Sequence, residues 1–301
     1  MIGQRAGLWI ALACGLIGLG PPAAAEDRGT AETIRVGMVH SLCKYVPDSM
    51  AELVTQPFSL LMRSQTGLNG EIVDAGDPNR VAGQLSEDRI HLGIFFGIEY
   101  AWIREKHPEL RPLMIAVNHS QHLRAHLIVR ADSKIGDIRD LKGKAVALPH
   151  QSREHCHVFL ERRCLKSGAS VQKHCAKLTT PANAEDALDD VVEGVVQAAV
   201  IDGPALDCFK RRKPGRFAQL KIAQTSEIFP ASVVVYRPGS LNAATLERFR
   251  AGMLNANKSS LGRELLNLSR LTGFEAVPAD YEKTLADIVK IYPPPKAGAA
   301  K

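Results

Sequence analysis

The chain has 301 residues, of which 45% are hydrophobic and 23% charged, and its formal net charge is +6. This composition excludes a disordered chain, a collagen-like chain and a polytopic membrane protein. A chain of this length can bury a large core, and its length favours two domains.

The first 25 residues have the pattern of a secretory signal peptide. Arg5 is the only charged residue before Glu26, an apolar stretch covers 6–19, and three alanines at 23–25 provide small residues for cleavage. The apolar stretch is short for a membrane span, which needs about 20 residues. We therefore expect residues 1–25 to be removed and the mature protein to lie in the periplasm. A lipid anchor at Cys14 is the less favoured alternative.

Five cysteines follow the expected cleavage point: Cys43, Cys156, Cys164, Cys175 and Cys208. Export makes disulfides possible, and the odd number leaves at least one thiol unpaired within the chain. Cys164 and Cys175 are the nearest plausible pair, because they flank the end of an expected helix. The other pairings stay open.

Hydrophobic periodicity predicts alternating strands and helices in the first part of the mature chain. Apolar residues between 50 and 61 recur at helical spacing, and Pro57 is expected to kink or restart that helix. Asp77 followed by Pro78 predicts the start of another helix. In chain order we expect a strand at 33–39, a helix ending before Gly67, a strand at 71–73, a helix at 77–87, a strand at 90–96, a helix at 97–106 and a strand at 113–117.

A second series of elements follows. We expect strands at 123–129, 145–148, 177–180, 198–201 and 231–236, helices at 152–166 and 184–193, and helices near 242–257, 259–270 and 278–291. The tail at 293–301 is rich in proline and alanine and is expected to be disordered. This alternation predicts an α/β fold with mainly parallel sheets. Ligands of such sheets bind beyond the carboxyl ends of the strands, and two domains place a cleft between them.

Several segments, taken together, resemble one family. The most specific is 126–148, with the sequence HLIVRADSKIGDIRDLKGKAVAL. Weaker matches are 35–39, 56–67, 81–93 and 195–202. Together these segments resemble the phosphate-, phosphite- and phosphonate-binding receptors of ABC importers, over roughly residues 33 to 275.

This resemblance implies a type II periplasmic binding protein fold, an α/β fold with two lobes joined by two crossing strands. Lobe 1 would comprise 31–118 and 233–292, lobe 2 would comprise 119–232, and the crossing strands would lie near 119–124 and 229–233. It also implies a function. A monomeric protein without a cofactor would capture a small phosphonate-, phosphite- or phosphate-like anion between the lobes and present it to an ABC permease. Nucleic acid is not an expected partner.

The segment before the expected helix at 152 is a candidate anion site. A helix N-terminus offers free N–H groups and a partial positive charge. The family has a run of small hydroxyl residues here, whereas this chain has Gln151, Ser152, Arg153 and Glu154. Ser152 retains one hydroxyl, Arg153 can add a bidentate contact with an anion, and Glu154 would oppose it. Alternatively, Ser152 is only the N-cap of the helix.

Three further residues are candidate ligand contacts. Tyr100 stands in the loop where the family often has a tyrosine that can donate to an anion; the alternative is an ordinary helical tyrosine. Ser41, after the first strand, is a weaker candidate of the same type. Asp202 stands where the family can hold the cation of an aminated ligand, but it can equally cap a helix starting at Gly203.

Histidine and cysteine gather at two places in the sequence. His40 and Cys43 follow the first strand, and His155, Cys156 and His157 lie on the expected helix at 152–166. Imidazole and thiolate bind zinc or copper, but the spacing matches no tight metal motif, so exposed or capping histidines are the simpler interpretation. A Cys43–Cys156 bridge is also open.

The abundance of histidine and cysteine supports an alternative function, that of a periplasmic accessory or sensory protein of the same fold that serves a redox or metal enzyme. Enzymatic activity of the chain itself is not expected. Cys156 and His157 are neighbours on a helix and point about 100° apart, so they do not face each other as a nucleophile and base would.

Overall fold

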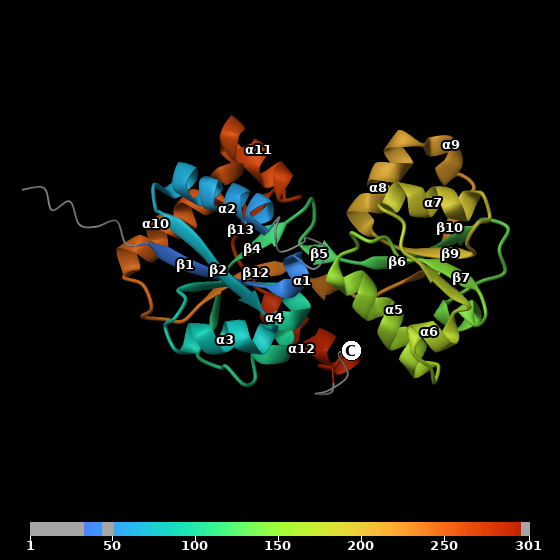
Figure 1. Ribbon diagram of the computed structural model, residues 1–301, viewed down its shortest axis with the longest axis horizontal. Coiled ribbons are helices and arrows are strands. Elements are labelled where there is room, and N and C mark those ends of the chain that lie inside the picture. The colour runs from blue at the N-terminus through green and yellow to red at the C-terminus, as the bar shows by residue number, and fades with distance from the viewer. Residues whose placement is uncertain (1–32, 44–50, 296–301) are drawn as a thin grey trace, which may run out of the picture. The chain divides into compact units, whose positions relative to one another are not determined.

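The structure is a computed structural model that describes residues 33–43 and 51–295 (Figure 1). It does not describe the side chains of 43, 51–54 and 74–75. The expected signal peptide at 1–25 and the tail residues 296–301 lie outside the described residues. None of the helices in the described ranges is both long enough and apolar enough to cross a bilayer.

Lobe 1 is built on a six-stranded mixed sheet. Its strand order is β13-β4-β12-β3-β1-β2. In chain order these strands are β1 (Ile34–Val39), β2 (Gly70–Gly76), β3 (Leu92–Phe95), β4 (Arg111–Val117), β12 (Ser232–Tyr236) and β13 (Gly273–Glu275). β1 runs parallel to β2 and β3, whereas β12 runs antiparallel to β3 and β4, as β13 does to β4.

Helices cover both faces of this sheet (Figure 1). One face packs against α2 (Ala51–Thr66), α10 (Ala243–Leu254) and α11 (Ser260–Leu268), and the other against α3 (Pro78–Ser86), α4 (Gly97–Ile103) and α12 (Tyr281–Ile291). Successive side chains of a strand point to opposite faces. Val233 and Val235 of β12 therefore join one apolar core, and Val234 joins the other. A short helix, α1 (His40–Cys43), follows β1.

Lobe 2 is built on a five-stranded sheet in the order β10-β6-β9-β7-β8. Its strands are β6 (Ala125–Arg130), β7 (Ala145–Ala147), β8 (Lys177–Thr179), β9 (Ala198–Asp202) and β10 (Leu220–Thr225). α5 (Glu154–Lys166) and α6 (Val171–His174) lie on one face, and α7 (Ala184–Val192), α8 (Gly203–Arg212) and α9 (Pro214–Phe217) lie toward the other (Figure 1).

Two short strands join the lobes. β5 (His122–Leu123) pairs antiparallel with β11 (Phe229–Pro230), so that Leu123 lies opposite Phe229. This ladder confirms the crossing strands expected near 119–124 and 229–233. The exact lobe boundaries, 31–118 with 233–292 and 119–232, stay predictions.

The expectation of mainly parallel sheets is wrong. Among the described strands, antiparallel pairings outnumber parallel ones. The reason lies in the crossings. After β11 the chain re-enters the sheet of lobe 1 as β12, which inserts between β3 and β4 in the opposite direction. Strands β10 and β13 were also not expected from the sequence.

Pro57 does not restart the second helix, and the alternative expectation, a kink, stays a prediction. α2 is one continuous helix with Pro57 inside it. Phe58, Leu61 and Met62, which follow the proline, are buried in the core of lobe 1. Because most helical stability in proteins comes from such packing, the buried face holds the helix together despite the hydrogen bond that proline cannot donate.

Candidate functional site

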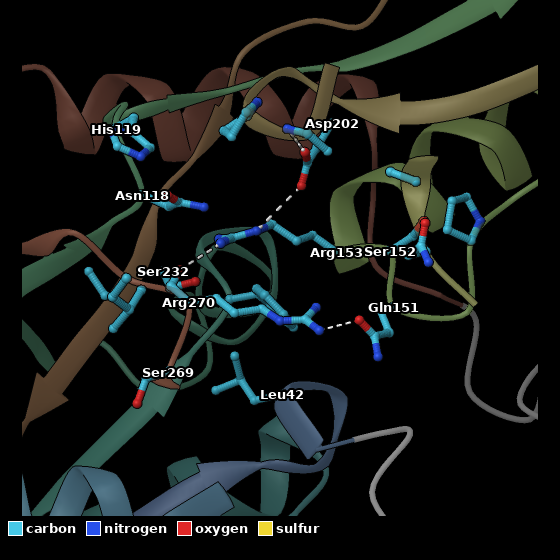
Figure 2. A pocket seen from close by; sticks show the side chains of 18 of the residues that line it. Leu42, Asn118, His119, Gln151, Ser152, Arg153, Asp202, Ser232, Ser269 and Arg270 are labelled. Carbon is cyan, nitrogen blue, oxygen red and sulfur yellow. Dashed lines mark hydrogen bonds and ion pairs between the residues drawn. The ribbon is translucent and has the colours of Figure 1, made fainter. Parts of the chain in front are cut away.

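A cavity of about 720 Å³ lies between the two lobes and is lined by residues from both (Figure 2). Several of its lining residues sit at or just beyond strand ends, which is where α/β folds place their ligands. Four charged residues line it: Arg153, Asp202, Arg211 and Arg270. Since arginine is always protonated in proteins, the cavity carries an excess of positive charge.

Arg153 enters the cavity from the start of α5. The helix begins at Glu154, so Arg153 is the N-cap residue, and no side chain caps this end. The expected helix start at Ser152, and the alternative that Ser152 is its N-cap, are therefore wrong. Nη2 of Arg153 donates to the backbone oxygen of Arg270 at 3.1 Å, and its Nε lies 3.5 Å from Oδ2 of Asp202.

Asp202, at the end of β9, uses its two carboxylate oxygens differently. Oδ1 accepts a hydrogen bond of 2.8 Å from the backbone N–H of Ala205 and so caps α8. Oδ2 faces Arg153 (Figure 2). The capping role that the sequence left open is thus confirmed. Because the other oxygen already faces a guanidinium, a cationic ligand group would have to displace that arginine.

Arg270 and Gln151 meet across the cavity. Arg270 lies in the turn after α11, and its Nη2 donates to Oε1 of Gln151 (Figure 2). The backbone of Arg270 is left-handed, with a φ of 54°, and that of His119, which also lines the cavity, has a φ of 61°. Such angles are strained for residues with a Cβ and concentrate at functional sites.

Two serines named from the sequence also line the cavity. The Oγ of Ser41, on α1, is buried and has no hydrogen-bond partner among the described residues. A buried, unpaired hydroxyl is unfavourable unless something binds it. Ser152 lies beside Arg153, and its backbone N–H donates to Pro149 rather than into the cavity.

Tyr100 does not line this cavity. Its side chain is 2% exposed in the core of lobe 1, and its hydroxyl donates to the backbone oxygen of Leu110 at 3.3 Å. Burial raises the pKa of Tyr100 to about 12. The sequence placed it on a helix correctly, but the buried face of α4 points it into the core of lobe 1.

The histidine and cysteine candidates do not form a metal site where the structure describes them. No group of three or more His, Cys, Asp or Glu residues in the described ranges is arranged to hold a metal ion. His40 is exposed, and Cys43 has no described side chain. His155 and Cys156 are buried in the first turn of α5, and His157 follows them half-buried.

Burial also controls the chemistry of the Cys156 thiol. It raises the pKa of the Cys156 thiol well above its usual value, so the thiol stays protonated and unreactive. Cys156, Cys164, Cys175 and Cys208 are free thiols in the structure. None of these four cysteines therefore forms a disulfide in the structure, and the pairing of Cys164 with Cys175 stays a prediction.

Sequence reasoning missed Arg270 and Arg211. Arg270 is 117 positions from its partner Arg153, and it follows a helix of lobe 1 rather than a recognisable motif. Arg211 belongs to a basic run at the end of α8 that looks like an ordinary solvated helix end. No local signal separates either residue from other surface arginines.

Comparison with known proteins adds a family and a fold. A family model described as "ABC transporter, phosphonate, periplasmic substrate-binding protein" matches residues 44–281. No curated protein matches the sequence.

Three solved structures share the fold at low sequence identity. XAC2383 from Xanthomonas citri bound to chloride ion is 18% identical, with 86% of this chain and 97% of that chain covered and a TM-score of 0.58. PhnD1 from Prochlorococcus marinus in complex with methylphosphonate is 14% identical, with coverage of 87% and 97% and a TM-score of 0.58. A binding protein component of an ABC phosphonate transporter from Pseudomonas aeruginosa is 16% identical, with coverage of 86% and 85% and a TM-score of 0.54. The fold is that of type II periplasmic binding proteins.

Proposed function

Because the chain belongs to the family of periplasmic substrate-binding proteins of phosphonate ABC transporters, we propose that it captures a small oxyanion in the cavity between its lobes. The ligand is phosphonate-, phosphite- or phosphate-like. The protein acts as a monomer, binds the anion without converting it, and presents it to a permease.

The observation that carries this proposal is the convergence of Arg153 and Arg270. Their side chains come from different lobes and line one cavity, where Nη2 of Arg153 donates to the backbone oxygen of Arg270. Arginine presents a planar fork of N–H donors that matches the oxygens of a phosphonate or phosphate. Asp202 is the only carboxylate among the described lining residues, and it faces Arg153. The remaining positive charge is therefore available for an anion.

Further polar groups support an oxyanion between the two arginines. Gln151 already accepts from Arg270, and its amide N–H₂ remains a donor. Ser41 contributes a hydroxyl without a partner among the described residues. The β5–β11 ladder joins the lobes through only two short strands, so a hinge motion there would bring the two sets of donors around the ligand.

Thermal unfolding with methylphosphonate, phosphite, phosphate and sulfate tests the proposal. A ligand at 100 times its Kd adds about 2.7 kcal/mol to the free energy of unfolding, which gives a measurable rise in Tm. We expect at least one phosphorus oxyanion to raise Tm and Arg270→Gln to abolish the rise. Arg63→Gln is the matched control, because Arg63 is exposed on α2 and does not line the cavity.

Two outcomes would contradict the proposal. One is that none of these anions raises Tm. The other is that Arg270→Gln and Arg63→Gln respond to the anion equally, because binding would then not depend on the cavity.

A further inference from the structure

The wall that lobe 1 contributes to the cavity is mainly apolar. Its apolar residues include Met38, Leu42, Phe58, Ile94, Phe96 and Phe274. The rings of Phe58 and Phe274 pack edge to face, with 6.4 Å between their centroids. This wall is thus made of core side chains that β1, β3, β13 and α2 hold in place.

The charged groups lie mostly on the opposite side, where lobe 2 contributes Arg153, Asp202 and Arg211 beside Gln151 and Ser152. The polar side chains of lobe 1 that line the cavity, such as Ser41, Asn118, Ser232 and Ser269, are uncharged. Among the described lining residues of lobe 1, Arg270 is the only charged side chain, and it extends toward Gln151 of lobe 2 (Figure 2). An anionic group held between the arginines therefore has a charged surface on one side and an apolar surface on the other.

The size of the cavity adds to this argument. Cavities that hold drug-sized molecules measure about 300–1,000 Å³, and the volume here, about 720 Å³, is in the middle of that range. A bare oxyanion would leave much of this space unfilled. Apolar walls gain free energy only when an apolar group replaces the water against them.

The described lining residues of the cavity offer no free carboxylate to an ammonium group. Oδ1 of Asp202 caps α8 through Ala205, and Oδ2 faces Arg153. The substituent of the ligand therefore faces apolar side chains rather than a counter-ion.

From this separation of charged and apolar walls we infer that the ligand is an amphiphilic anion, an oxyanion that carries an apolar substituent. The inference rests on the proposed function and narrows it. The oxyanion lies between Arg153 and Arg270, and the substituent lies against Phe58 and the apolar side chains around it. Neither a bare oxyanion nor an aminated one uses both walls.

Isothermal titration of the purified protein with methylphosphonate, phenylphosphonate and 2-aminoethylphosphonate tests the inference. These ligands share one head group and differ in the substituent. We expect phenylphosphonate to bind at least tenfold more tightly than methylphosphonate, which corresponds to about 1.4 kcal/mol. We also expect a more negative heat-capacity change, because apolar surface is buried. 2-Aminoethylphosphonate should bind no more tightly than methylphosphonate.

A pair of leucines on α11 provides matched variants. Leu268 is 69% exposed and lines the cavity, whereas Leu261 is 50% exposed and does not line it. Both are exposed, so serine at either position should leave the fold intact. Leu268→Ser should weaken phenylphosphonate binding about threefold and methylphosphonate binding by less, because the larger apolar substituent loses more buried apolar contact. Leu261→Ser should change the binding of neither ligand.

The outcomes separate this inference from the proposed function. If methylphosphonate binds as tightly as phenylphosphonate, or if 2-aminoethylphosphonate binds most tightly, the inference is overturned and the proposed function stands. If none of the three ligands binds and the inorganic anions also fail to bind, the proposed function itself is wrong.

Discussion

Nη2 of Arg153 donates a hydrogen bond to the backbone oxygen of Arg270, and this bond of 3.1 Å joins the start of α5 in lobe 2 to the turn after α11 in lobe 1. Two guanidinium groups thus share one cavity. An anion that lies between two guanidinium groups is attracted by both of them. The carboxylate of Asp202 partly compensates the charge of Arg153. No carboxylate among the described residues forms an ion pair with Arg270.

Removing the charge of Asp202 should strengthen anion binding. Asparagine is as good an N-cap as aspartate, so Asp202→Asn should preserve the cap on α8 and leave stability nearly unchanged. It also removes the negative charge beside Arg153, so we expect the Kd for the bound oxyanion to fall several-fold in isothermal titration. Asp202→Ala is the comparison, because it loses the cap and should cost about 1 kcal/mol in urea unfolding. Weaker anion binding by Asp202→Asn would show that the carboxylate helps to hold the ligand.

Substitutions at Arg270 should separate the strain in its backbone from the role of its side chain in binding. Its φ of 54° is unfavourable for any residue with a Cβ, whereas glycine adopts it freely. Arg270→Gly should therefore be about 1 kcal/mol more stable than Arg270→Ala in urea unfolding. Both variants should lose anion binding.

Ser269, the preceding residue, is the control for that comparison. Its φ is −86°, so glycine relieves no strain there and only increases the freedom of the unfolded chain. Ser269→Gly should thus be less stable than Ser269→Ala, the reverse of the order at Arg270. The same order at both positions would show that the left-handed angle of Arg270 carries no strain.

Acid should destabilise the protein through His155. Burial lowers the pKa of His155 to about 4. The ring packs against Phe229 of the crossing strand β11, with 5.6 Å between centroids. The unfolded chain binds a proton near pH 6.5, but the folded chain does not until about pH 4. The free energy of unfolding therefore falls as the pH drops through this window, by about 2 kcal/mol at pH 5.

Urea unfolding at pH 7 and pH 5 measures this effect. His155→Leu cannot titrate, so its loss of stability between the two pH values should be smaller than that of the natural protein by about the same 2 kcal/mol. His40→Asn, which removes an exposed histidine, is the control and should behave like the natural protein. An equal pH dependence for His155→Leu and the natural protein would refute the assignment.

Cys164 and Cys175 should form a disulfide when the protein is oxidised. The two thiols are hydrogen-bonded to each other, which raises the pKa of Cys164 and lowers that of Cys175. A low pKa favours the thiolate, which attacks glutathione disulfide; Cys164 then displaces the glutathione, so that two glutathione thiols are released for each protein disulfide. Closing a loop of roughly ten residues should stabilise the protein by about 3 kcal/mol.

Titration of free thiols in denaturant, before and after incubation with glutathione disulfide, measures this reaction. The natural protein should lose two thiols and gain Tm. Cys175→Ser should form no such bridge, whereas Cys208→Ser, which removes the exposed thiol, should still form it. Unchanged stability after oxidation would count against a bridge between these positions.

Most of the local structure follows from the amino-acid sequence alone. Asp77 and Pro78 start α3 as predicted, with Asp77 accepting from the backbone N–H groups of Asn79 and Arg80. Gly67 ends α2 with a φ of 66°. Capping, left-handed turns and hydrophobic periodicity depend on residues within a few positions of one another, so one segment contains all the information. The segment at 126–148 was specific enough to indicate the family and its two-lobed fold.

The direction of β12 and the set of residues that line the cavity depend instead on how the whole chain packs. β12 runs antiparallel to its neighbours because the chain returns from the other lobe, and nothing in its own residues encodes that. The same holds for the residues of the site. Tyr100 is turned into the core, and Arg270 is brought into contact with Arg153 although 117 positions separate the two residues in the sequence. Such convergence depends on how distant apolar faces pack together, whereas a polar side chain in a turn has no periodicity that reveals where it will point.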